Sequence, residues 1–405
     1  MRAIVVGGGV AGPATALALR RVGVEPVVLE ARTAEEMAAG SYLTLSPNGV
    51  HAADELGVGE GLRAEALPTR RNELVSGTGR VLGSVTLGAP LPDGWSGLTL
   101  KRPVLARLLS AAAVDAGIEV RHGARVVAIH ESADQVEVEL ADGARIDGDL
   151  LVAADGVHSP VRQLVDPTAP AARYVGLTNF GGITRRTPLA DDLPDGAWRM
   201  VFGSRAFFGC HRTPGGDVVW FANVPRPAIG SEERTATSAE QWQQWLVGLF
   251  ATDVGPTAEL VRTGELELAG DSTYDLGHVP IWHRGRLVLV GDAAHAPSFS
   301  LGQGASMALE DAVDLARCLR DVPGGLGEVF ATYEGLRRAR VERIVAAGAR
   351  SSSSKVPGRV GRAFRDTMLR MVFRYVVTDR SVAWMSDHRV SLEVPVSASA
   401  AGSPR

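Results

Sequence analysis

AIVVGGGVAG, residues 3–12, is the stretch that decides the fold of this chain. Its first four residues form an apolar run as short as a buried strand, and small and apolar residues follow at helical spacing over residues 13–22. Gly23 then ends the helix, and residues 27–29 form a second apolar run. The pattern predicts a strand, a glycine turn, a helix and a strand, which is how a Rossmann-type α/β domain opens.

The turn itself follows the pattern G-x-G-x-x-G at Gly7, Gly9 and Gly12. The first glycine permits the turn, the second lets a pyrophosphate approach the backbone, and the third lets helix and strand pack closely. Free N–H groups at the helix start, around Ala11, favour phosphate oxygens there. Glu30, 18 residues after Gly12, can accept hydrogen bonds from a ribose diol. The motif predicts a dinucleotide site, but alone it does not separate FAD from NAD.

Length, charge and cysteine content argue against several classes of protein for this chain. The chain has 405 residues, which favours two joined domains, and a net charge of −4, which argues against a nucleic-acid partner. It holds only two cysteines, so no disulfide framework is expected and a reducing, cytoplasmic setting fits. We expect no targeting peptide before the first strand, and no apolar run approaches the roughly 20 residues of a membrane-spanning helix.

The remaining chain changes its pattern several times. Residues 136–140 alternate between apolar and charged side chains, and residues 150–153 and 287–290 are short apolar runs typical of buried strands. Between them, residues 174–224 are aromatic and strand-rich, and residues 239–251 favour a helix. We therefore expect a discontinuous FAD-binding domain with an inserted α+β substrate domain built on a mixed or antiparallel sheet. The expected divisions are 1–172 and 286–350 for the FAD-binding domain, 173–285 for the substrate domain, and 351–405 for a C-terminal helix and disordered tail.

The chain ends in helical segments. One helix is expected to turn apolar residues such as Ala305 and Leu309 to one face, with Glu310, Asp314 and Arg317 elsewhere. Further helices continue to about residue 350, and residues 351–354, a run of four serines, resemble a linker. A basic amphipathic helix over residues 362–377 is expected to pack on the protein's own body or on a second subunit rather than on a membrane.

Two later motifs carry a family resemblance. DGVHSPVR, residues 155–162, is similar to a DG motif, and GDAAH, residues 291–295, followed by GQG, residues 302–304, is similar to a GD motif. With the glycine turn in correct order, they make residues 1–350 resemble the class A flavoprotein monooxygenases of the para-hydroxybenzoate hydroxylase fold. The resemblance implies FAD as the cofactor.

The resemblance also implies roles for single residues. Arg102 sits where this family contacts the flavin, and Val126 where the backbone meets adenine. Asp155 belongs to a segment that this family associates with binding of both FAD and NAD(P)H. The alternative interpretation is that Asp155 is a turn residue that forms a surface ion pair with Arg162. His295 and His158 are expected to be structural, and we assign no catalytic residue and no metal.

Elementary chemistry supports the GD motif. Asp292 follows an apolar strand at the carboxyl edge of the sheet, where its carboxylate can bond a ribityl hydroxyl. Gly302, Gln303 and Gly304 open the next helix, whose positive end would face the flavin pyrimidine.

The implied activity is that of a monooxygenase. NAD(P)H, a transient co-substrate, would reduce FAD, and O₂ would then give a C4a-hydroperoxyflavin that hydroxylates or epoxidises a small, aromatic or polyketide-like molecule. Two alternatives stay open, a flavin-dependent reductase or dehydrogenase and a catalytically silent flavoprotein. The oligomeric state and the preference between NADH and NADPH are not predicted. Candidate cavity-lining aromatic residues are Phe180, Phe207, Phe208, Trp220 and Phe221, and candidate polar contacts are His211, Arg199 and Asn223.

One position departs from the family pattern. Proline usually stands four residues after the histidine of the GD motif, and this chain has Phe299 there. Because the loop must pass beside the flavin ring, Phe299 is predicted to shield that ring or touch the substrate, with a core position as the alternative.

Overall fold

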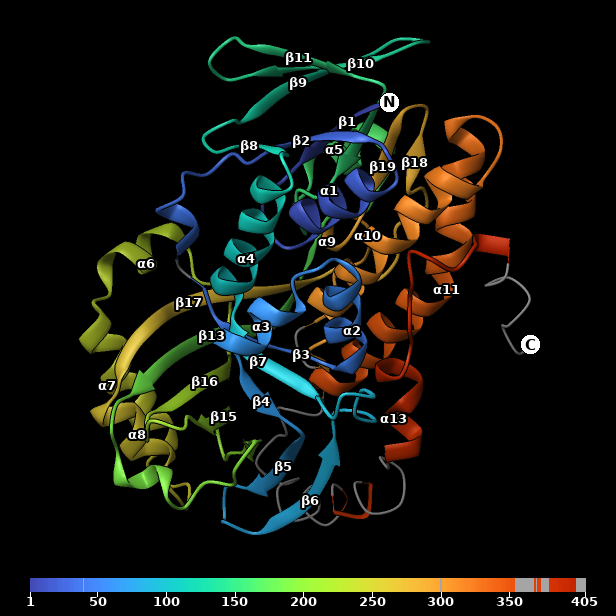
Figure 1. Cartoon of the computed structure of the whole chain (residues 1–405). Coiled ribbons are helices and arrows are strands. Elements are labelled where there is room, and N and C mark those ends of the chain that lie inside the picture. Colours follow the sequence, from blue (N-terminus) through green and yellow to red (C-terminus); the bar gives the residue numbers. More distant parts are fainter. Residues whose placement is uncertain (39, 299–300, 354–367, 369, 373–378, 398–405) are drawn as a thin grey trace.

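Two large sheets organise the computed structural model, which describes residues 1–38, 40–298, 301–353, 368, 370–372 and 379–397. Figure 1 shows a six-stranded sheet in the upper half of the molecule and a seven-stranded sheet in the lower half, with helices and a smaller sheet between them. The expected combination of a Rossmann-type domain with a second, largely antiparallel sheet is confirmed.

The six-stranded sheet contains the predicted opening. Strand β1 (Arg2–Val6) pairs in parallel with β2 (Glu25–Leu29) on one side and with β12 (Leu150–Ala153) on the other. Strand β8 (Glu119–Arg121), parallel to β2, forms one edge of the sheet. On the other side β19 (Leu287–Leu289) is parallel to β12, and β18 (His283–Arg284), antiparallel to β19, forms the second edge. Helix α1 (Ala11–Arg21) ends before Gly23, whose φ of +82° suits a glycine after a helix.

Helices cover this sheet and share its apolar core. Helix α1 packs between α4 (Arg102–Asp115) and α10 (Gly304–Asp321), and α10 also contacts α2 (Pro47–Glu55) and α11 (Leu326–Ser353). The linker expected at residues 351–354 is wrong for its first three serines, because they continue α11. The shorter helices in this half are α3 (Gly59–Glu65), α5 (Pro160–Val165), α9 (Asp292–His295) and the 3-10 turn η1 (Glu36–Ala38).

Two small sheets complete the upper and middle layers. Strands β9 (Val126–Glu131), β10 (Val136–Leu140) and β11 (Arg145–Gly148) form an antiparallel sheet at the top of Figure 1, and the alternating apolar residues of β10 are buried as predicted. Strands β3 (Tyr42–Leu45), β7 (Gly97–Lys101) and β4 (Leu67–Thr69) form a second antiparallel sheet between the two large ones.

The seven-stranded sheet forms the lower half. Its strands, in spatial order, are β17 (Glu265–Asp275), β13 (Arg173–Thr184), β16 (Val218–Pro225), β15 (Phe207–Arg212), β14 (Ala197–Phe202), β5 (Arg71–Ser76) and β6 (Val81–Thr86). All neighbours are antiparallel except β14 and β5. Strands β5 and β6 thus join this sheet from within residues 1–172, and the division of the chain into domains stays a prediction.

One face of the lower sheet is covered by helices. Buried side chains of α7 (Ala239–Phe250) and α8 (Thr257–Thr263) pack against the face that carries Phe208 and Trp220, while α6 (Ser231–Ala236) and the turn η2 (Pro188–Ala190) lie beside it. The other face is turned toward the upper half of the molecule. The predicted helix over residues 239–251 is confirmed as α7.

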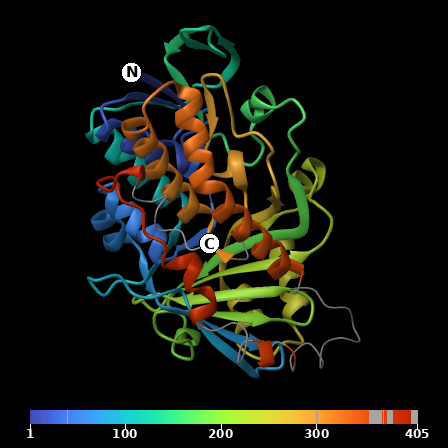
Figure 2. The same ribbon diagram turned by 90° about the vertical axis from the view of Figure 1, so that its right-hand side faces the viewer.

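The C-terminal part of the chain returns to the middle of the molecule. Figure 2 shows α11 running along one side from the upper half toward the lower sheet, with α13 (Asp379–Ser386) below it. Arg340 of α11 donates hydrogen bonds to the backbone oxygens of Trp384 (2.9 Å) and Met385 (2.7 Å), and Asp379 accepts one from the Thr86 hydroxyl (2.8 Å). The basic helix expected over residues 362–377 lies, except for 368 and 370–372, outside the described residues.

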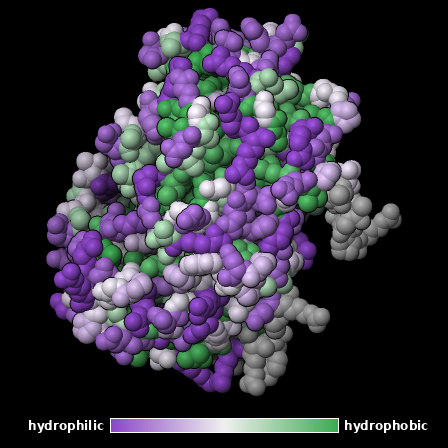
Figure 3. All heavy atoms as spheres, in the orientation of Figure 1, coloured by the Kyte–Doolittle hydropathy of each residue, from purple (hydrophilic) through white to green (hydrophobic). Residues whose placement is uncertain are grey.

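Figure 3 shows hydrophilic side chains over most of the visible face, with apolar residues gathered mainly in its upper half. Within the described part of the chain, no helix combines the length and apolarity needed to cross a membrane.

Candidate active site

One large cavity is lined by residues of both large sheets and of the small sheet between them. Its volume is about 1380 Å³, larger than the roughly 300–1,000 Å³ of a pocket for one small molecule. All of the predicted cofactor residues except Gly12 line it. The cavity therefore has room for a dinucleotide together with a second ligand.

The glycine turn fits a pyrophosphate. A Cβ added at Gly7, whose φ is +114°, would lie 2.3 Å from the Ala154 carbonyl oxygen, and one at Gly12 would lie 1.8 Å from the Gly7 carbonyl oxygen. These two glycines are needed for close packing of the protein itself. A Cβ at Gly9 would meet no atom within 4 Å, so the backbone there is open to the cavity. Helix α1 has no side-chain cap and no acidic residue in its first turn, which leaves its N–H groups suited to an anion.

Glu30 lies at the carboxyl end of β2 and is held firmly. Its carboxylate accepts hydrogen bonds from the Gly8 amide (2.7 Å), the Arg32 amide (2.9 Å) and the Arg32 guanidinium (3.0 Å). Burial by itself would raise the pKa of Glu30, but these hydrogen bonds outweigh it and lower the pKa below its ordinary value. Glu30 is therefore an ionised acceptor beside the cavity, and its contact with a ribose stays a prediction.

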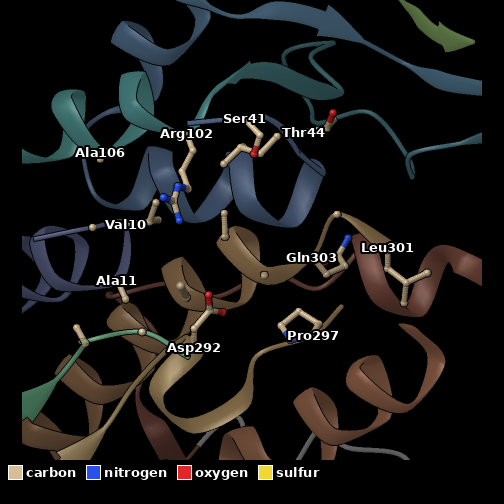
Figure 4. Close-up of a pocket in the computed structure, with 18 of the residues that line it drawn as sticks. Val10, Ala11, Ser41, Thr44, Arg102, Ala106, Asp292, Pro297, Leu301 and Gln303 are labelled. Carbon is tan, nitrogen blue, oxygen red and sulfur yellow. The ribbon is translucent and has the colours of Figure 1, made fainter. Parts of the chain in front are cut away.

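Asp292 and Arg102 point into the cavity from opposite walls (Figure 4). Asp292 begins α9 directly after Gly291, whose φ of +58° reverses the chain at the end of the upper sheet. Loss of solvation inside the protein raises the pKa of Asp292, while the neighbouring His295 and Arg102 oppose this shift. Arg102 begins α4, and Val126 begins β9 further along the same cavity wall.

The start of α10 is fixed by buried amides. Gln303 donates a hydrogen bond to the Ser46 hydroxyl (2.9 Å) and accepts one from Asn48 (3.1 Å). Gly302 has a φ of +64°, which favours glycine, and Gly304 is the first residue of the helix. Because no side chain caps α10 and its first turn holds no acidic residue, its amides can meet a negatively charged ligand edge.

The DG segment lies against the same cavity. Asp155 accepts a hydrogen bond from the Val161 amide (3.3 Å) through Oδ2, while its buried Oδ1 has no partner among the described residues. Burial raises the pKa of Asp155. Arg162 is buried and donates to the backbone oxygens of Ala293 (3.1 Å) and Val157 (2.8 Å), so the alternative that placed it in a surface ion pair is wrong.

The other end of the cavity has a floor formed by the lower sheet. Side chains of alternate residues on β14, at positions 198, 200 and 202, face the cavity, as do Asn72 and Leu74 of β5. Gly209 makes this floor flat, because a Cβ there would lie 2.3 Å from the Phe221 ring and 3.1 Å from the Met200 sulfur. The cavity-facing set on this sheet, hereafter the floor, is Asn72, Leu74, Val85, Asn179, Trp198, Met200, Phe202, Phe207, Phe221 and Asn223.

Comparison with known proteins agrees with this geometry. The family described as FAD binding domain matches residues 1–348. The 3-hydroxybenzoate 6-hydroxylase of Klebsiella oxytoca is 32% identical over 354 residues, covering 85% of this chain and 86% of its own. The FAD-dependent urate hydroxylase of Klebsiella pneumoniae is 32% identical over 360 residues, covering 85% and 88%. Klebsiella pneumoniae HpxO, solved with FAD and uric acid, superposes with a TM-score of 0.80 at 27% identity, covering 96% of this chain and 98% of that one.

The chain belongs to the FAD-dependent monooxygenases. The cofactor expected from the sequence, FAD, is thereby confirmed. The residues assigned to hold it remain predictions, and the orphaned Asp155 oxygen and the open backbone at Gly9 fit that assignment.

A buried ionic network lies beneath the GD segment of this monooxygenase. Glu310, Asp314 and Arg317 were expected away from the apolar face of α10, yet all three are almost fully buried. Arg337 of α11 compensates the carboxylates, since it donates to Glu310 (2.7 Å) and to Asp311 (2.7 Å) and lies 3.5 Å from Asp314. Arg317 donates to Asp314 at 2.8 Å. Paired charges of this kind can be buried because each compensates the other's loss of water.

Two outer members extend the network of the monooxygenase. Arg340 donates two hydrogen bonds to Glu310 (2.8 and 2.9 Å) and also holds the backbone of α13. Asn48 donates to Glu310 (2.7 Å) and to Gln303, so the network reaches the cofactor end of the cavity. No local sequence pattern indicates that Arg337 and Arg340 meet these acidic residues of α10.

The sequence-based substrate residues divide between the two faces of the lower sheet. Phe207, Phe221 and Asn223 face the cavity of the monooxygenase. Phe180 borders the cavity, but its ring packs on Trp242 of α7 at 5.3 Å, on the opposite face of the sheet. The interpretation of Phe208 and Trp220 as cavity residues is wrong, because they are buried against the helices on the opposite face. The interpretation of His211 and Arg199 as polar substrate contacts is also wrong, since neither residue lines the cavity. His211 contacts Thr69 (3.2 Å) and the Arg212 oxygen, and Arg199 pairs with Glu73 (2.7 Å).

Sequence reasoning missed several floor residues of the monooxygenase. Trp198, Met200 and Phe202 line the cavity, and their alternation in residues 197–202 was the available signal. Asn72 and Leu74 carried no such signal, because nothing local shows that β5 pairs with β14. Phe299 lies outside the described residues.

Proposed function

We propose that this monooxygenase uses NAD(P)H and O₂ to hydroxylate or epoxidise a small aromatic or polyketide-like molecule. One observation carries the proposal: the same cavity borders the predicted dinucleotide-binding turn and the aromatic floor. A cofactor and an apolar substrate would therefore share one cavity, as transfer of an oxygen atom between them requires.

FAD, when bound, supplies the electron transfer and the activation of O₂. The protein's own residues would hold and orient it. The open backbone at Gly9 and the start of α1 would receive the pyrophosphate, Glu30 a ribose diol, and Asp292 a ribityl hydroxyl. Arg102 and the amides at the start of α10 would stabilise negative charge at the flavin pyrimidine.

The floor would orient the substrate and exclude water. Trp198 is fixed by hydrogen bonds from its indole N–H to the hydroxyls of Thr44 (3.0 Å) and Thr99 (3.0 Å), and its ring meets Phe221 edge to face at 5.2 Å. Phe202 and Phe207 form a second edge-to-face pair at 5.0 Å. Rigid aromatic surfaces of this kind favour a flat apolar ligand.

The ionisable residues near the floor are not suited to act as a base toward the substrate. His211 is turned toward Thr69, and burial lowers its pKa, so it is a neutral side chain outside the cavity. Tyr42 lines the cavity, and burial raises its phenol pKa, so it would donate a hydrogen bond rather than act as a base. Residues with these properties bind and position the substrate and leave bond formation to the cofactor.

The deciding experiment measures whether an oxygen atom from O₂ enters the product. FAD-loaded protein would be supplied with NADH or NADPH and aromatic candidates under isotope-labelled O₂. We expect candidate-stimulated oxidation of the nicotinamide and one labelled oxygen atom in the product. Stimulated oxidation with an unlabelled, reduced or dehydrogenated product would instead establish the reductase or dehydrogenase alternative.

We also propose a cytoplasmic setting. Cys210 and Cys318 are both free and buried, and burial raises the pKa of each thiol to about 12, which keeps them protonated and unreactive.

A further inference from the structure

The floor offers a substrate no ionisable partner. Strands β5, β6 and β13–β16 are described throughout, and every side chain that they turn to the cavity is apolar, an amide or a hydroxyl. The charged neighbours Glu73 and Arg199 lie on alternate positions of β5 and β14 and pair with each other. A carboxylate laid on this floor would lose its water and gain no opposite charge.

Three rows of side chains cross the floor, as the strand register shows. The first holds Asn179, Asn223, Phe207 and Phe202, and the third holds Trp198, Asn72 and Val85. The middle row holds Phe221, Met200 and Leu74, with Gly209 leaving a flat space between the first two. Polar groups therefore stand only at the sides of an apolar strip.

Asn72 is the unusual polar group of the floor. Its Oδ1 atom is buried and has no hydrogen-bond partner among the described residues, whereas Asn179 and Asn223 bond each other at 2.6 Å. A buried amide oxygen without a donor is unfavourable, and a bound ligand with an N–H or O–H group would relieve it. Asn72 thus marks where a polar edge of the ligand would lie.

Cationic side chains line other walls of the same cavity. Arg32, Arg102 and Arg125 lie with the predicted cofactor residues, and Arg343 and Arg350 come from α11. The guanidinium of Arg343 lies over the ring of Trp384, 3.9 Å from its centroid, and so faces α13. These cations do not belong to the strands that form the floor.

We propose that the substrate is a neutral, planar aromatic molecule that lies on the apolar strip and gives an N–H or O–H hydrogen bond to Asn72, and that aromatic carboxylates are poor ligands. This inference rests on the proposed function for its site and names the substrate class that the site selects.

Two shape-matched probes test it. Equilibrium dialysis of FAD-loaded protein at about pH 8 would measure the dissociation constants of 2-naphthamide and of 2-naphthoate, which is ionised there because carboxyl pKa values lie near 4. We expect the amide to bind at least about tenfold more tightly. Binding of the carboxylate as tightly or more tightly, or of neither probe, overturns the proposal.

Single-residue variants test which side chains recognise the two probes. Asn72→Leu should weaken binding of the amide about tenfold, without lowering the melting temperature and without changing the naphthoate affinity. The matched control Val85→Ala, in the same row, should weaken both probes alike and keep their ratio. An Asn72→Leu variant with wild-type amide affinity would refute the role of Asn72, and naphthoate binding that Arg343→Met abolishes would place recognition on α11 instead. Because dialysis needs no turnover, its result is independent of the labelled-oxygen experiment.

Discussion

The imidazole Nε2 of His295 lies 2.6 Å from Oδ2 of Asp311, and both side chains are buried. The same carboxylate oxygen accepts a hydrogen bond from the Gly291 amide at 2.8 Å. One buried oxygen therefore holds both ends of the short helix α9, and Asp292 projects into the cavity from between them. The position of Asp292 is thus determined by residues that do not line the cavity.

The two motif aspartates should differ in their importance for FAD. Asp292→Asn is expected to weaken FAD binding more than Asp155→Asn, because only Asp292 is predicted to bond the ribityl chain, whereas Asp155 also supports the Val161 amide. Loss of a hydrogen bond to a charged group costs about 1.5–3 kcal/mol, or roughly tenfold or more in affinity. Fluorescence titration of the apoprotein with FAD measures both constants. Equal affinity of wild type and Asp292→Asn would show that the role is misassigned.

Two substitutions in the glycine turn should have different effects, one on FAD binding and the other on stability. Gly9→Val would fill the open space at the turn, so FAD affinity should fall at least about tenfold while the apoprotein keeps its melting temperature. Gly12→Val would place its Cβ against the Gly7 carbonyl oxygen, so it should lower the melting temperature itself. Differential scanning fluorimetry with and without FAD distinguishes the two. A Gly9→Val protein that binds FAD normally would contradict the assigned pyrophosphate position.

Acid should weaken the network around Glu310. Burial alone would raise the pKa of Glu310, but Arg337 and Arg340 outweigh burial and hold the pKa well below its ordinary value. A lowered folded-state pKa means that this stabilisation is complete above the unfolded value, near pH 4.3, and is lost as the pH falls toward the folded value. Glu310→Gln should therefore cost about 3–5 kcal/mol of unfolding free energy at neutral pH, with a smaller difference at about pH 3.5.

Urea unfolding at both pH values checks this expectation. Glu328→Gln, at an exposed position at the start of α11, serves as the control and should change the unfolding free energy by no more than about 1 kcal/mol. A loss for Glu310→Gln that does not change with pH would mean that packing, and not charge, accounts for it.

Neighbouring aromatic residues on opposite faces of the lower sheet should behave differently. Phe208 is fully buried against Trp220 and Phe250, so Phe208→Ala should cost about 3–5 kcal/mol of stability. Phe221 is half-buried at the cavity, so Phe221→Ala should cost less stability but release more hydrogen peroxide per NAD(P)H oxidised, because the substrate is held less firmly. Measuring unfolding and peroxide yield on the same preparations tests both, and a fully coupled Phe221→Ala enzyme would remove this residue from the site.

Local patterns were enough for the sequence to determine the Rossmann-type opening, the placing of Asp292 after a buried strand, and the helices α1, α7 and α10. Each depends on residues within about one turn or one strand of each other: the glycines of residues 7–12 on their flanking strand and helix, and Gly23 on the end of α1. The cofactor type followed from three such local motifs in the right order. The same reasoning placed apolar residues on one face of α10 but gave no information about what its polar residues meet.

The tertiary structure alone decided which polar and aromatic residues face inward. Glu310 and Asp314 are buried because Arg337, more than 20 residues later, lies against them, and no local spacing encodes that meeting. Phe207 and Phe208 are equally aromatic, and which one faces the cavity depends on the register of β15 between β14 and β16. Asn72 reaches the floor only because β5 pairs with a strand that begins about 120 residues further along the chain. Side-chain burial and cavity shape arise from such long-range pairing, which short-range periodicity does not contain.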